Sequence, residues 1–82
     1  MSANPAQTGD AASRARAILA EAVSRPVGEI PDDAAIGMLE GWDSLAHIRL
    51  IAGIEAALDR PLTTEEVIGV HALDKIAALL PG

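Results

Sequence analysis

The chain has 82 residues, enough for one small domain with a modest hydrophobic core. It contains no cysteine, which excludes disulfides and thiolate metal sites, and its two histidines lack carboxylates at ligand spacing, so we expect no metal site. A formal net charge of −6 argues against nucleic acid as a partner, and the lack of a long apolar run argues against a membrane.

The composition favours an all-α fold, because the β-branched and aromatic runs typical of strands are missing. Residues 1–9 are polar and small and lack the pattern of a secretory signal, so we predict a disordered tail on a cytoplasmic protein. Asp10 is predicted to cap a first helix, which Pro26 ends at about Arg25. Its apolar positions follow helical spacing: Ala15, Ile18, Leu19 and Ala22.

A long connection follows over residues 26–43, interrupted by prolines, glycines and aspartates. Connections of this length inside a compact domain are often functional. Trp42 is predicted to anchor the connection, with its indole N–H bonded to a backbone carbonyl or to water. Four other apolar residues of the connection are expected to fold back over the core: Ile30, Ile36, Met38 and Leu39.

The second predicted helix runs from Ser44 to Leu58 or Asp59, with Asp43 as its cap. Steps of about 100° per residue separate two apolar faces. The expected core face holds Leu50, Ile51, Ile54, Ala57 and Leu58. The opposite face holds Leu45, Ile48, Ala52 and Ala56, with Arg49 and Glu55 among them. A second apolar face indicates a contact surface, although small domains also expose scattered apolar atoms.

Two more helices are predicted after Pro61. A short one begins at Thr63 or Thr64 with an acidic first turn, Glu65 and Glu66, and ends near residues 69–71. The last one has Leu73, Ile76, Ala77 and Leu80 at helical spacing. The sequence therefore predicts a small four-helix bundle with a long first loop and a short third helix.

Ser44 is the candidate functional residue, at the start of the second helix. His47 follows three residues later, but neither an orienting group nor an oxyanion hole is indicated, so we expect no enzyme activity from this pair. The alternatives for His47 are a bond to a backbone carbonyl or water and a place at the mouth of a tunnel between the second and third helices. A helix N-terminus favours negative charge, so a phosphodiester on Ser44 would be stabilised there.

The motif Gly41-Trp42-Asp43-Ser44-Leu45, with Pro61, Glu65-Glu66 and Leu73-Asp74-Lys75-Ile76-Ala77 after it, resembles the acyl carrier protein family over about residues 12–80. The resemblance implies a carrier domain over residues 10–82. It also implies a 4'-phosphopantetheine arm on Ser44, transferred from coenzyme A by a phosphopantetheinyl transferase, with Asp43 as the helix cap beside it. The further partners implied are an acyl-loading ligase or acyltransferase and a synthase or other acyl-processing enzyme, and a monomer is expected.

The chain departs from the family pattern on the outward face of the second helix. Carriers of fatty-acid synthesis usually present an acidic helix to basic patches on their partners. Here that face is assigned Arg49, Ala46, Ala52 and Ala56, with Glu55 as its one acid, which favours a dedicated polyketide or other specialised acyl pathway. An aminoacyl or peptidyl carrier and an unmodified helical adaptor remain alternatives. Glu65-Glu66 is a helix start or a secondary acidic contact. The expected partner interface is Leu45, Ile48, Arg49, Ala52, Glu55 and Ile68.

Overall fold

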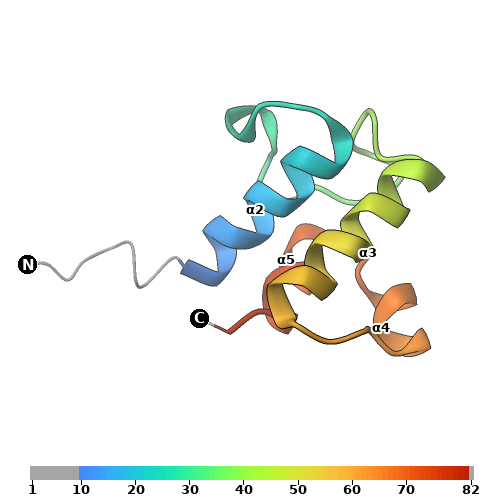
Figure 1. Cartoon of the computed structure of the whole chain (residues 1–82). Coiled ribbons are helices and arrows are strands. Elements are labelled where there is room, and N and C mark those ends of the chain that lie inside the picture. Colours follow the sequence, from blue (N-terminus) through green and yellow to red (C-terminus); the bar gives the residue numbers. More distant parts are fainter. Residues whose placement is uncertain (1–9, 82) are drawn as a thin grey trace, which may run out of the picture.

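The computed structural model describes residues 10–81 and contains four α-helices in that range. They are α2 (Asp10–Val23), α3 (Ser44–Leu58), α4 (Thr64–Gly69) and α5 (Leu73–Leu79), with a short 3-10 helix η1 (Val27–Glu29) after α2. The small all-α bundle with a long first loop and a short third helix is therefore confirmed (Figure 1). The predicted tail over residues 1–9 and the predicted cap by the Asp10 side chain lie outside what the structure describes.

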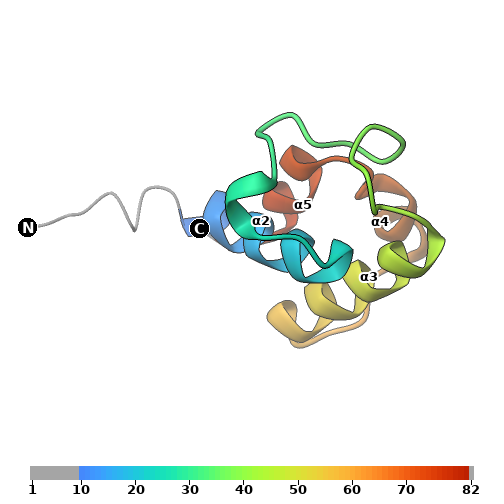
Figure 2. The same cartoon turned by 90° about the horizontal axis from the view of Figure 1, so that it is seen from above.

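Helix α2 packs against both α3 and α5 (Figures 1 and 2). The chain end after α5 returns to the start of α2, where Arg14 Nη1 donates to the carbonyl of Pro81 at 3.3 Å. The largest fully buried side chains come from α2, α3, α5 and the end of α4: Leu19, Leu50, Ile54, Val70 and Ile76. Within residues 10–81, no helix is both long enough and apolar enough to cross a membrane.

The predicted core face of α3 is confirmed, with one correction. Leu50 and Ile54 are fully buried, and Ile51 and Leu58 are partly buried against the core. Ala46 was assigned to the outward face, and this prediction is wrong, because Ala46 is only 4 % exposed. Ala46 stands one helical turn before Leu50 and two before Ile54, so it shares their face.

Backbone hydrogen bonds fix the long loop to the linker between α4 and α5. The amide of Ile36 donates to the carbonyl of His71 at 2.8 Å, and the amide of Leu73 donates to that of Ala34 at 2.9 Å. The side chains of Ile30 and Leu39 pack at the core as predicted. The same prediction is wrong for Ile36 and Met38, which are 42 % and 75 % exposed. A loop held by its backbone does not need to bury every apolar side chain.

A capping box begins α4. The Thr63 hydroxyl accepts the amide of Glu66 at 3.1 Å, and a Glu66 carboxylate oxygen accepts the amide of Thr63 at 2.9 Å. Arg60 binds both oxygens of the same carboxylate, at 3.0 and 2.9 Å. Hydrogen bonds from Arg60 and from the Thr63 backbone lower the pKa of Glu66 from 4.5 to about 2. Glu66 therefore serves the helix start, as predicted.

We expect the Glu66 carboxylate to make folding stability depend on acid. Its pKa is lowered in the folded chain, so its stabilisation is complete above the unfolded pKa of 4.5 and is lost as the pH falls toward about 2. Glu66→Gln should lower the urea midpoint at about pH 6. The free energy of unfolding of this variant should also fall less steeply than that of wild type as the pH is lowered. Glu65→Gln, a change in the neighbouring exposed side chain, is the matched control. Parallel acid profiles of wild type and Glu66→Gln would contradict this expectation.

Candidate functional site

The segment before Ser44 is fixed to the end of α2. Arg25 Nε donates to the carbonyl of Glu40 at 2.9 Å, and its Nη2 donates to the Glu40 carboxylate at 2.9 Å. Gly41 has φ +94, and a Cβ there would lie 3.2 Å from the carbonyl oxygen of Val23. Only glycine adopts this conformation without strain and at this close approach. The glycine of the motif is therefore required by the backbone path that leads to Ser44.

Asp43 caps α3 as predicted. Its Oδ1 accepts the amide of Ala46 at 2.9 Å, which satisfies one of the free N–H groups of the first turn. Ser44 is the first residue of α3 and is exposed. Its hydroxyl forms no hydrogen bond with any of the residues that the structure describes. The site thus presents an accessible serine hydroxyl at the positive end of a fifteen-residue helix.

Two hydrogen bonds link the turn before Ser44 to α4 through the side chains of Trp42 and His47. The Trp42 indole N–H donates to His47 Nδ1 at 3.1 Å, and His47 Nε2 lies 3.3 Å from the carbonyl oxygen of Val67 in α4. Since Nδ1 accepts, the ring proton is on Nε2, which donates to that carbonyl. The two rings are stacked, with centroids 6.2 Å apart and planes 24° apart. Trp42 is buried, 5 % exposed, which agrees with an anchor.

These contacts test two predictions made from the sequence. The predicted hydrogen bond between His47 and a backbone carbonyl is confirmed by the contact with Val67. The prediction that the Trp42 N–H reaches a backbone carbonyl or water is wrong, because it reaches the His47 ring. Trp42 lies directly before the cap of α3 and His47 lies in the first turn of that helix, so the indole N–H reaches the ring nitrogen. With both ring nitrogens engaged, His47 has no lone pair free to take a proton from Ser44.

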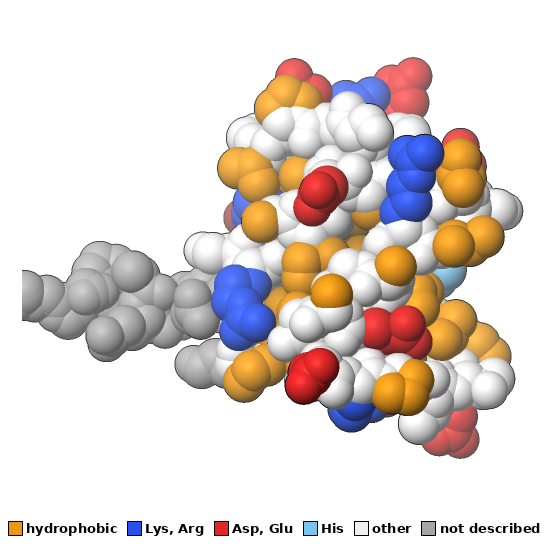
Figure 3. All heavy atoms as spheres, in the orientation of Figure 1, with side chains coloured by type: hydrophobic (Ala, Val, Ile, Leu, Met, Phe, Trp, Pro, Cys, Tyr) orange, Lys and Arg blue, Asp and Glu red, His pale blue; other side chains and the backbone are white. Residues whose placement is uncertain are grey.

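Exposed apolar side chains follow Ser44 on α3, and another is exposed on α4. Leu45, Ile48 and Ile68 are 56 %, 66 % and 71 % exposed. The contact between His47 and Val67 brings α3 and α4 together, so Ile48 and Ile68, each one residue later, lie on neighbouring helices. Figure 3 shows apolar side chains gathered over the start of α3 and over α4, on the right of the view. Leu45 and Ile48 thus lie within about one turn of Ser44 on α3, and Ile68 lies on α4, which contacts α3 through Val67 and His47.

The charged members of the predicted interface differ in their surroundings. Arg49 and Ala52 are exposed on α3. Glu55 is half-buried, and its Oε2 accepts the amide of Leu62 at 2.9 Å, so its carboxylate is used to hold the loop after α3. The exposed side of α3 therefore presents a cation and no unengaged carboxylate.

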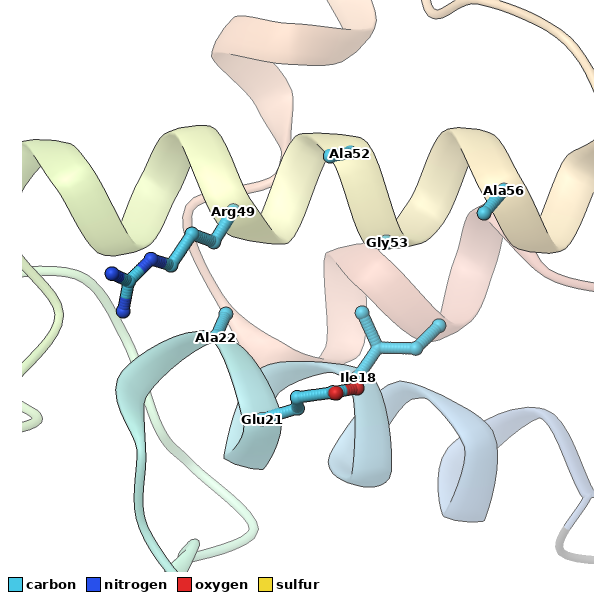
Figure 4. Close-up of a pocket in the computed structure, with 7 residues that line it drawn as sticks. All are labelled: Ile18, Glu21, Ala22, Arg49, Ala52, Gly53 and Ala56. Atoms are coloured by element: carbon cyan, nitrogen blue, oxygen red, sulfur yellow. The ribbon is translucent and has the colours of Figure 1, made fainter.

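A groove between α2 and α3 was not predicted from the sequence. It has a volume of about 500 Å³ and is open to solvent (Figure 4). Its apolar lining consists of Ile18 and Ala22 from α2 and Ala52, Gly53 and Ala56 from α3. The signal that could have found it is the run of small residues on α3, because small side chains leave space beside a neighbouring helix.

Within residues 10–81, no three or more His, Asp or Glu side chains are grouped so that they could hold a metal ion. A scan against protein-family models and a search of curated proteins both find no match for this chain.

Proposed function

We propose that this chain is an acyl carrier protein whose Ser44 hydroxyl takes a 4'-phosphopantetheine arm from coenzyme A. The observation that carries the proposal is the setting of Ser44: an exposed hydroxyl without a hydrogen-bond partner among residues 10–81, within Gly41-Trp42-Asp43-Ser44-Leu45. A serine without an adjacent base is a poor nucleophile toward a substrate of its own. It is open to a separate transferase, and the helix N-terminus favours the charge of a phosphodiester.

The bound arm would end in a thiol that holds acyl groups as thioesters, a group that the cysteine-free chain lacks. The protein's own contribution is to present the attachment point. Arg25 holds the carbonyl of Glu40, and Trp42 is bonded to His47, so the turn before Ser44 is fixed from two sides. A flexible arm on a fixed attachment point gives each partner enzyme a high effective concentration of the cargo.

The exposed side of α3 supports a dedicated acyl pathway over housekeeping fatty-acid synthesis. Arg49 stands there among apolar side chains, and Glu55 is engaged by Leu62. A basic docking patch would meet a like charge at this position. The same feature favours an aminoacyl or peptidyl carrier as the second candidate, which would differ in the enzyme that loads it. The proposed partners are a phosphopantetheinyl transferase, a loading ligase or acyltransferase, and a downstream synthase.

Intact mass spectrometry tests the proposal directly. The purified, unmodified protein is incubated with coenzyme A, Mg²⁺ and a broad-specificity phosphopantetheinyl transferase. We expect wild type to gain the mass of one phosphopantetheine unit and Ser44→Ala to gain none. Ser13→Ala, which changes an exposed serine on α2, is the matched control and should be modified like wild type.

An unmodified wild type in a folded sample would refute the carrier proposal and leave a helical adaptor. Modification of Ser44→Ala would show that the arm is attached elsewhere. Once the arm is attached, loading by an acyltransferase or by an amino-acid-adenylating enzyme separates the two carrier classes.

A further inference from the structure

The groove between α2 and α3 has a structural origin in one close helix contact. A Cβ on Gly53 would lie 2.9 Å from Cγ2 of Ile18, so the two helices approach more closely there than any larger residue allows. Beside this contact, Ala22, Ala52 and Ala56 are too small to fill the space between the helices. The result is an open trough with apolar walls and a size within the range of side-chain and ligand pockets.

Two charged residues border the trough, and they do not neutralise each other. Arg49 lies at one end, and Figure 4 shows its guanidinium and the carboxylate of Glu21 pointing in opposite directions. Arg49 forms no hydrogen bond or ion pair with any of residues 10–81. Arg16, Arg25 and Arg60, by contrast, each bind a carboxylate of this chain. In a chain of net charge −6, an exposed cation without an internal partner needs a partner from outside to be buried favourably.

We infer that the trough and Arg49 together form the docking surface for a partner enzyme of this carrier that presents an acidic and aliphatic docking element. The docking element supplies an aliphatic side chain to the trough and a carboxylate to Arg49. Charge complementarity selects the carboxylate, and the alanine and glycine walls select the aliphatic group. This inference rests on the proposed function and extends the contact surface from α3 to α2.

The surface also has a direction. Arg49 marks the end of the trough nearer Ser44, because it stands five residues, about 7.5 Å, along α3 from that serine. When Arg49 binds the carboxylate of a partner, the part of the partner's surface next to that carboxylate therefore faces Ser44. Anchoring at one side of α3 leaves the Ser44 hydroxyl and its arm accessible to the partner's active site.

Two helical peptides of equal length provide the probe. Each presents leucines at i and i+4 on one face; one has glutamates beside them and the other has lysines. Amide chemical shifts of the ¹⁵N-labelled, unmodified protein are followed during titration with each peptide. We expect the glutamate peptide to produce saturable shifts at Arg49, Ala52, Gly53 and Ala56. The lysine peptide should bind at least about tenfold more weakly.

Matched variants separate charge from shape. Arg49→Glu should reverse the preference between the peptides, whereas Lys75→Glu, the same charge change on α5, should leave it unchanged. Ala56→Leu should fill the trough and remove the shifts, whereas Ala78→Leu, the same change at an exposed position of α5, should not.

Equal binding of both peptides, shifts confined to other surfaces, or no saturable shifts would each overturn the inference. The measurement uses unmodified protein, and arm attachment at Ser44 is read by mass. Failure of the docking surface is therefore distinguishable from failure of the carrier proposal.

Discussion

Trp42→Ala is expected to lower the free energy of unfolding by about 3–5 kcal/mol, the range for removing a buried large aromatic side chain. Trp42 is 5 % exposed, and its loss leaves a cavity and also frees His47 Nδ1. Small domains have about 5–15 kcal/mol in total, so the loss takes a large share of the stability and should clearly lower the urea midpoint. Urea unfolding followed by far-ultraviolet circular dichroism measures the change.

Trp42→Phe is the control that separates packing from hydrogen bonding. It keeps most of the buried ring but removes the N–H, so we expect a loss of about 1–3 kcal/mol, the cost of an unsatisfied buried acceptor with some lost volume. If Trp42→Phe and Trp42→Ala were equally destabilised, the hydrogen bond to His47 would carry the effect, and the packing argument would be refuted.

Leu50→Ala is expected to cost about 2–5 kcal/mol, because Leu50 is fully buried at the centre of the core face of α3. Ile48→Ala, two residues earlier on the same helix, removes a side chain that is 66 % exposed. We expect it to change stability by no more than about 0.5 kcal/mol, since few contacts are lost and alanine favours helix.

The comparison of Leu50→Ala and Ile48→Ala tests the assignment of faces on α3. The same urea experiment gives both values. A cost for Ile48→Ala as large as that for Leu50→Ala would mean that Ile48 is packed in solution, and it would remove Ile48 from the proposed contact surface.

The helices and their ends could be predicted from the sequence because their causes are local. Asp43 caps α3 through an amide three residues later, and the alternation of Leu50 and Ile54 with exposed positions follows from the helical period. Thr63 and Glu66 begin α4 for the same kind of reason.

The groove, the orientation of the loop and the partner of the Trp42 N–H depend on distances between elements. These distances cannot be inferred from the spacing of residues in one sequence. The space beside Gly53 exists because of Ile18, 35 positions earlier in the chain. The orientation of Ile36 depends on the carbonyl of His71. The acceptor for the Trp42 N–H depends on how the loop turns into α3. Either a backbone carbonyl or a side chain could accept this hydrogen bond.

The stacking of Trp42 on His47 places an intrinsic fluorophore beside the candidate site. The sequence contains one tryptophan and neither tyrosine nor phenylalanine, so its near-ultraviolet absorption and emission come from that one indole. The indole stands two residues before Ser44 and is bonded to a ring one turn into the same helix. Any event at Ser44 that moves these rings apart will change the emission of the native chain, so that modification and docking can be followed in real time without a label.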